Sequence, residues 1–325
     1  MPDSNNCITF AADKEKNDMR ANIIKRKVCI SRWLALLVFP MLIACGDDEP
    51  DDVVPVPVAR DYSVLTAQTN NAVGATWREG DSLFVYTLSS TSRFDYALAG
   101  SPGSTTGTFN RQPSAVTFND DAVCYALTAV HNIYSASATE GSHMKLSYQL
   151  PEEYEARLLS SENGSFLMNI PSWGLLTFDG SGRPSTTLKT LTAFLVVDLS
   201  KVPEDTRSIL ITTHNSIRLN GADVAGGAGE PLAGNFDCIL EDGASLASSS
   251  LFRYKDIIRI VLDEDGYDKE WQTLGRIFIP IVVGNYQRLQ VVALAEQYYF
   301  DYEWNGTLLA TFDNQQFALN SLYQQ

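Results

Sequence analysis

The chain has 325 residues, of which 45% are hydrophobic and 19% are charged, and its formal net charge is −15. This length suits two domains of roughly 100–150 residues, and the composition is that of a globular protein, not a disordered one. Residues 1–44 carry seven Lys/Arg and four Asp/Glu, a balance of +3, so the remainder carries −18, which disfavours binding to nucleic acid.

A secretory leader is predicted at the N-terminus. Basic residues in 20–27 precede an apolar stretch at 33–44, and this order is typical of a signal peptide. The apolar stretch is short for a membrane-spanning helix. We therefore expect residues 1–44 to be a signal peptide, with Met19 as an alternative start.

The leader ends in Leu42-Ile43-Ala44-Cys45, which resembles the lipobox of bacterial lipoproteins. The resemblance implies that the Cys45 thiol receives diacylglycerol and becomes the first residue. A plain signal peptide with an incidental cysteine is the alternative. The acidic residues 47–49 resemble the surface-export signal of Bacteroidales lipoproteins. The expected location is therefore the surface of a Gram-negative outer membrane.

The mature chain is predicted to consist of a tether followed by β-strands. Residues 46–60 are acidic and then rich in Val and Pro, which predicts an extended tether. Strong β formers then recur between Gly, Asn, Asp and Ser turns, while long helical periodicity is scarce. Strands are predicted at 82–86, 123–127, 191–199, 208–213, 256–262, 277–283 and 289–294. The expected class is all-β, with a domain boundary near 200–207 and a surface loop at 221–234.

Catalytic and metal motifs are scarce. The three histidines are not at metal-ligand spacing, and no G-x-S-x-G motif occurs. Asp263, Asp265 and Asp268 are candidate Ca²⁺ ligands, but a polar hairpin turn is favoured because the full twelve-residue loop is missing. We expect no enzyme activity and no cofactor, with a paired-carboxylate glycosidase as the enzymatic alternative.

Two further cysteines, Cys124 and Cys238, lie far apart in apolar stretches. They are expected to be buried free thiols, not partners in a disulfide.

Five segments stand out in order along the chain: the W-x-x-G-D opening at 77–86, Gly107-Thr108-Phe109, Tyr148-Gln149-Leu150-Pro151, the strand at 188–197, and the apolar-Pro…Gly-x-Tyr segment at 277–286. Taken together, they resemble motifs of the fimbrillin-like proteins of Bacteroidales. The aromatic residue and the histidine usual in the fourth motif are absent here. Each motif alone is weak, and their order together with the lipobox makes the resemblance specific.

The resemblance implies a pilus subunit built of two tandem transthyretin-like Greek-key β-sandwich domains, at 61–200 and 201–325. It further implies lipoprotein export, cleavage by an arginine-specific protease and assembly by donor-strand exchange. Other pilus subunits would then be partners, and a host or bacterial surface molecule is a candidate ligand in adhesion. The alternative is a surface lipoprotein that binds a glycan or host protein and never polymerises.

Mapped onto this sequence, Arg60 is the candidate cleavage residue, because it is the only basic residue between Cys45 and Arg78. Residues 45–60 are expected to be the lipid anchor and the tether or removable first strand, and a cut at the Arg60–Asp61 bond would release Val53 to Arg60 as that strand. An uncleaved tether is the alternative, and Pro55 and Pro57 count against a well-paired strand there. Little sequence follows the last expected strand, which suggests a tip or accessory subunit.

Overall fold

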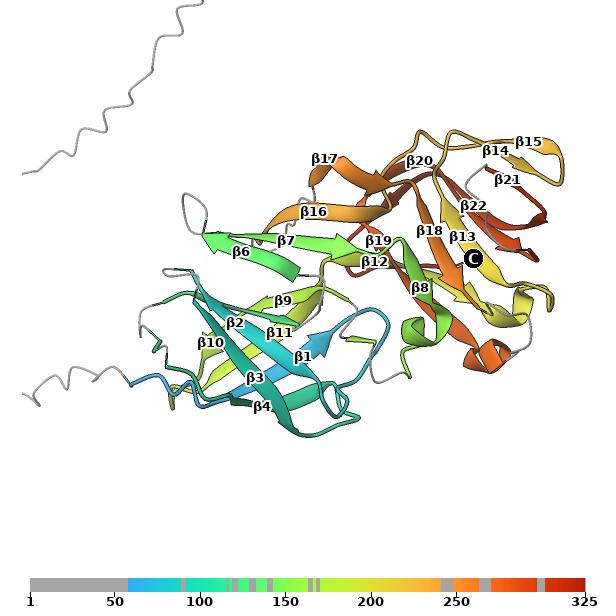
Figure 1. Ribbon diagram of the computed structural model, residues 1–325. Coiled ribbons are helices and arrows are strands. Elements are labelled where there is room, and N and C mark those ends of the chain that lie inside the picture. Colours follow the sequence, from blue (N-terminus) through green and yellow to red (C-terminus); the bar gives the residue numbers. More distant parts are fainter. Residues whose placement is uncertain are drawn as a thin grey trace, which may run out of the picture. The chain divides into compact units, whose positions relative to one another are not determined.

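The computed structural model describes residues 58–324, apart from gaps at 89–91, 116, 119–121, 129–132, 139–142, 163–165, 168–169, 241–247, 263–269 and 297–301; the side chains of 133–138 and 248–254 are also not described. These residues belong to one compact unit, Val56–Gln325. The described chain is nearly all strand, which confirms the all-β class (Figure 1). Its helices are short 3₁₀ turns: η1 at Ala156–Leu159, η3 at Leu199–Lys201 and η4 at Glu270–Leu274.

The first sheet contains eight described strands, seven of which close into a ring. In spatial order they are β1 (Val64–Asn70), β4 (Thr106–Arg111), β3 (Arg93–Gly100), β2 (Ser82–Thr87), β5 (Cys124–Thr128), β9 (Ser172–Leu175), β11 (Pro184–Thr190) and β10 (Thr177–Phe178). The ring closes because β1 pairs in parallel with β11 as well as antiparallel with β4, whereas β10 pairs with β11 alone among the described strands. Alternate residues of β1 and β2 are buried, as expected for strands with one face on a core. That core contains Leu65, Trp77, Leu83, Phe94 and Phe109.

Strand β5 is buried on both faces, which explains its uninterrupted apolar sequence. Cys124 and Ala126 face the core inside the ring. Tyr125 and Leu127 face a second core, shared with a four-stranded sheet of order β17-β16-β7-β6. Its strands are β6 (Ile133–Ala138), β7 (Met144–Leu150), β16 (Ala233–Leu240) and β17 (Ser248–Lys255).

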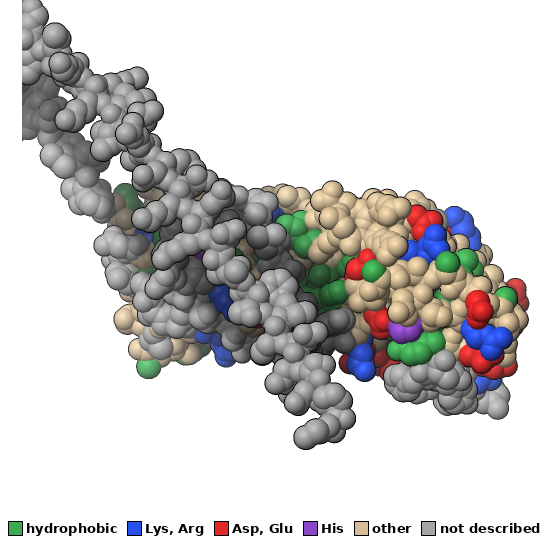
Figure 2. Space-filling view, turned by 90° about the horizontal axis from the view of Figure 1, so that it is seen from above, with side chains coloured by type: hydrophobic (Ala, Val, Ile, Leu, Met, Phe, Trp, Pro, Cys, Tyr) green, Lys and Arg blue, Asp and Glu red, His purple; other side chains and the backbone are tan. Residues whose placement is uncertain are grey.

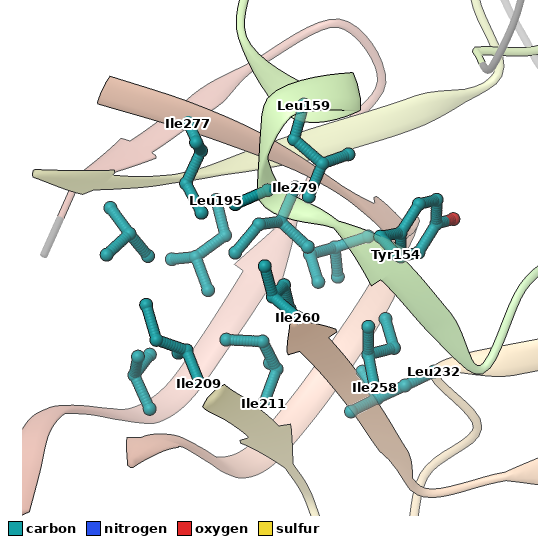
Figure 3. Close-up of a cluster of buried hydrophobic side chains, with 14 of the residues drawn as sticks. Tyr154, Leu159, Leu195, Ile209, Ile211, Leu232, Ile258, Ile260, Ile277 and Ile279 are labelled. Carbon is teal, nitrogen blue, oxygen red and sulfur yellow. The ribbon is translucent and has the colours of Figure 1, made fainter. Parts of the chain in front are cut away.

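A third core lies between two further sheets (Figure 3). The larger sheet has the order β22 (Gly306–Phe317), β20 (Gly284–Leu294), β13 (Ser208–Thr212), β18 (Ile257–Val261) and β8 (Glu153–Glu155); the smaller has the order β19 (Arg276–Val282), β12 (Thr192–Asp198) and β23 (Leu322–Gln324). Ile209, Ile211 and Ile260 of the larger sheet meet Leu195 and Ile279 of the smaller one. β-Branched residues fill this core because they pack well on pleated surfaces.

A small sheet of β15 (Ala222–Ala225), β14 (Ser216–Leu219) and β21 (Glu303–Trp304) covers the outer face of the larger one. Strand β15 lies within the segment 221–234, so the expectation of a continuous surface loop there is wrong. The Gly/Ala-rich sequence lacks apolar alternation, and pairing with β14 makes it a strand.

Backbone pairing crosses the expected boundary at residue 200. Strand β7 pairs with β16, and β8 pairs with β18, although β7 and β8 precede that boundary. The division at 61–200 and 201–325, and the two transthyretin-like sandwiches, stay predictions. Among the described residues, no helix is both long and apolar enough to cross a membrane.

Candidate functional site

The chain first meets the described body at residues 58–61, which we call the leading segment. Val58 is 57% exposed, whereas Asp61 donates its backbone N–H to the carbonyl of Gly182 at 2.9 Å. Gly182, in the turn between β10 and β11, has φ +79°, and a Cβ there would collide with the carbonyl oxygen of Ala59. Only glycine permits this approach, so the leading segment lies directly against that turn.

Among the described residues, Phe178, Ala122 and Tyr62 hold the side chain of Arg60, and we call these three the cradle. Its guanidinium carbon lies 4.2 Å from the centre of the Phe178 ring, a cation–π contact. One guanidinium nitrogen donates to the carbonyl of Ala122 at 3.1 Å and to the Tyr62 hydroxyl at 3.3 Å. The predicted cleavage residue is therefore half-buried and engaged, not free in solvent.

Beneath the cradle, aromatic rings stack. The Tyr62 ring lies 3.8 Å from that of Phe118 at an interplanar angle of 6°, and Phe118 lies 3.7 Å from Phe94. The Cys124 thiol is buried below them, and desolvation raises its pKa to about 11. The stack ties the leading segment to the core inside the ring.

Asp61 lies on the other side of the predicted scissile bond and faces solvent. Hydrogen bonds from Ser63 lower the pKa of its carboxyl, and its Oδ1 accepts from the Ser63 backbone N–H at 3.0 Å. Together with Arg60, Tyr62 and Arg111, these residues line an open surface hollow of about 600 Å³. Both predicted cleavage residues therefore lie in the lining of this hollow.

A second feature is the edge strand β22. It has twelve residues and, among the described strands, pairs with β20 alone. One charged residue lies in it, Asp313, and Arg288 of β20 forms an ion pair with that carboxylate. Figure 2 shows acidic and basic side chains close to one another on the coloured part of the face that it draws. An exposed edge with little net charge can accept another strand.

The W-x-x-G-D motif at 77–81 forms the turn that leads into β2. The carboxylate of Asp81 accepts the backbone N–H of Arg78 at 2.8 Å, and Gly80 adopts φ +89°. Trp77 is fully buried, and its indole N–H donates to the carbonyl of Ala67 at 3.1 Å. Asp81 is only 2% exposed, and desolvation raises its pKa to about 6. These contacts give the motif a structural role.

The remaining predicted sites fall elsewhere. Cys45 and the candidate Ca²⁺ ligands Asp263, Asp265 and Asp268 lie outside the described residues. Within the described ranges, no group of three or more His, Cys, Asp or Glu could hold a metal. Cys124 and Cys238 are buried free thiols, as predicted.

One cluster was not anticipated from the sequence. The His214 Nδ1 lies 2.6 Å from Asp256 Oδ2, and the imidazole stacks on the Tyr302 ring at 3.7 Å. The partners are more than forty residues apart, so sequence spacing contains no signal for them.

Comparison with known proteins finds no family model and no curated protein that matches the sequence. Among solved structures, a fimbrial protein from Bacteroides ovatus is similar at 10% identity and a TM-score of 0.35, over 82% of this chain and 48% of that one. The tip fimbrial protein Mfa3 from Porphyromonas gingivalis, truncated at its C-terminus, is similar at 10% identity and a TM-score of 0.30, over 71% and 77%. A protein named for cell adhesion from Bacteroides eggerthii is similar at 10% identity and a TM-score of 0.26, over 73% and 76%.

The names of these solved structures describe fimbrial or cell-adhesion proteins. The chain spans about half the length of the first of them. Identities near 10% and TM-scores below 0.5 carry no functional conclusion by themselves.

Proposed function

We propose that the chain is a fimbrillin-like pilus subunit. It is exported as a lipoprotein on Cys45, cut after Arg60 by an arginine-specific protease, and joined to other subunits by strand addition at the outer-membrane surface. The observation that carries the proposal is the place of the Arg60–Asp61 bond. Strand β1 begins at Val64, so a cut at that bond would detach the anchored segment and leave all the described strands covalently intact.

Strand addition needs an edge with free backbone groups, and β22 supplies the longest edge strand of the described sheets. A donor segment from a neighbouring subunit would extend the sheet β22-β20-β13-β18-β8. The ion pair of Asp313 with Arg288 leaves no uncompensated charge along the strand to repel the donor. The tip or accessory role stays a prediction.

The test uses the full-length chain expressed in a Bacteroidales host. The surface form is isolated and its N-terminus identified by mass spectrometry, in the wild type and in Arg60→Gln. We expect Asp61 as the N-terminus of the wild type and an uncut, lipidated chain for the variant. Negative-stain microscopy, with and without partner subunits, then separates polymer from monomer. Wild-type protein that keeps its lipidated Cys45 and never polymerises would contradict the proposal.

One observation favours the ligand-binding alternative. A hollow of about 420 Å³ lies over β1, β9 and β11, with Thr66, Gln68, Trp173, Thr187 and Lys189 in its lining. Hydroxyl and amide groups beside an aromatic ring suit a polar sugar. A glycan array probed with wild type and with Gln68→Ala tests this: binding that is lost in the variant, by a chain that stays monomeric, would favour the alternative.

A further inference from the structure

We propose that the folded chain holds its own cleavage site closed, and that cutting at Arg60–Asp61 waits for the leading segment to lift off the turn between β10 and β11. The inference rests on the proposed function, because it takes Arg60 as the cleaved residue. It adds a regulatory step, in which the cradle of Phe178, Tyr62 and Ala122 sets how often the bond can be reached.

The guanidinium of Arg60 is already bound within the fold. An arginine-specific protease recognises its substrate by taking this group into a pocket of its own, with the flanking backbone extended in the protease cleft. In the folded chain the group lies over Phe178 and donates to Ala122 and Tyr62. The protease and the cradle therefore compete for one side chain, and the contacts with the cradle must break before the protease can bind it.

The bond itself is fixed to the body from both sides. Hydrolysis adds water across the amide, leaving a carboxylate on Arg60 and an ammonium group on Asp61. The nitrogen that must leave is the backbone nitrogen of Asp61, and its N–H is hydrogen-bonded to the Gly182 carbonyl. On the other side, Ala59 lies against Gly182, where a Cβ would collide with its carbonyl oxygen. Contacts on both sides of the bond thus keep the backbone on the body and out of a protease cleft.

The next residue in the chain, Tyr62, anchors the segment to the core. Tyr62 is only 6% exposed and stacks on Phe118, so the bond lies close to a fixed point. A short stretch between an anchored arginine and a buried tyrosine cannot extend without local opening. Where such opening is fast relative to cutting, the cleavage rate follows the open fraction.

The experiment uses the full-length chain with Cys45→Ser, which stays unacylated. Trypsin is added, and mass spectrometry follows the appearance of peptides that begin at Asp61. The test variant is Phe178→Leu, and Phe178→Tyr, which keeps an aromatic ring, is its matched control. Phe312→Leu alters a partly buried aromatic residue that packs against the third core, and it serves as the control for general destabilisation. The bond after Arg157, whose side chain is 72% exposed, is the internal reference.

We expect Phe178→Leu to speed cutting at Arg60 about tenfold, the effect of losing one partly desolvated cation–π contact on the open fraction. Cutting after Arg157 should stay unchanged, and Phe178→Tyr and Phe312→Leu should behave as wild type at Arg60. Equal rates at Arg60 in wild type and Phe178→Leu would overturn the inference. An equal acceleration by Phe312→Leu would do so too, because it would point to global unfolding.

Thiol labelling gives a second readout that needs no protease. Cys124 lies under the cradle, whereas Cys238 lies in the core between the first sheet and β16. Phe178→Leu should raise alkylation of Cys124 and leave that of Cys238 unchanged; unchanged labelling of Cys124 would count against opening. Failure of the proposed function looks different, since the cell-surface form would then keep residues before Asp61 whatever the rates in vitro.

Discussion

The side-chain amide of Asn320 donates a hydrogen bond to the backbone carbonyl of Asn70 at 2.9 Å, which joins residues 250 positions apart. The side-chain oxygen of Asn320 accepts the backbone N–H of Ala72 at 2.8 Å, and its own backbone N–H donates to the Thr192 carbonyl at 3.0 Å. One residue in the turn between β22 and β23 thus satisfies backbone groups at the end of β1 and the start of β12. Asn320 has a φ of +53°, a left-handed conformation that asparagine adopts more readily than most other residues.

Replacing Asn320 tests this junction. Asn320→Ala removes three side-chain hydrogen bonds, with Asn70, Ala72 and Thr190, and leaves alanine at a positive φ without polar compensation. We therefore expect a loss of about 1–3 kcal/mol in the free energy of unfolding. Asn320→Gly keeps the backbone conformation and should cost less. Urea unfolding measures both. Two variants as stable as the wild type would show that the junction does not contribute.

Asp81 makes stability depend on pH. Its pKa of about 6 in the fold exceeds the ordinary value of 3.8, so the native state binds more protons than the unfolded chain between these values. Stability should therefore fall as pH rises from 4 to 6. Asp81→Asn keeps an acceptor for the Arg78 N–H and removes the buried charge. We expect it to match the wild type near pH 4 and to exceed it by roughly 2–3 kcal/mol at pH 7.

Chemical denaturation across this pH range provides the measurement. Glu79→Gln, a change at the exposed neighbour, is the control and should leave the pH dependence unaltered. If the free energy of unfolding changed with pH equally in Asp81→Asn and wild type, Asp81 would not be the group responsible for the pH dependence.

Ile260 tests the third core. It is fully buried among Ile209, Ile211 and Ile279, so Ile260→Ala should cost about 2–5 kcal/mol through lost burial and an unfilled cavity. Leu308→Ala, in contrast, changes a side chain that is 40% exposed and should cost under about 0.5 kcal/mol. Thermal or urea unfolding distinguishes them, and similar losses for both would show that the core is wrongly placed.

The edge of β22 tests the assembly route. Thr307→Lys with Thr311→Lys adds two charges at exposed positions of this strand, as natural proteins do to keep edges unpaired. We expect folding to persist and assembly of the cleaved chain with partner subunits to fall at least tenfold by microscopy. If the double variant forms as many fibres as the wild type, then β22 is not the edge that accepts the donor strand. Thr106→Lys, an exposed change in β4, is the control.

Strand positions could be predicted from the sequence because runs such as 208–213 and 277–283 combine β-branched residues with flanking turns, and β13 and β19 lie there. Pairing was harder. Nothing local indicates that β7 joins β16, since that register depends on Leu146 and Cys238 sharing a core. Strand β15 was missed because its Ala- and Gly-rich sequence has no apolar alternation.

For the candidate site, too, some features could be predicted from the sequence and others could not. Arg60 stands out in the sequence because no other basic residue is near it, but two of the groups in its cradle, Ala122 and Phe178, are more than sixty residues away. Their convergence depends on the closed ring of strands, and sequence spacing has no signal for it. The burial of Cys124 could be predicted from the apolar stretch around it, whereas its position beneath Tyr62 could not.

The identity of the first residue of the cell-surface form, determined by mass spectrometry, decides whether the chain is processed and assembled as proposed. We expect a chain that begins at Asp61, recovered in fibres with other subunits, and an uncut chain when Arg60 is replaced by Gln. A wild-type surface form that still begins at acylated residue 45 and remains monomeric would refute both processing and assembly.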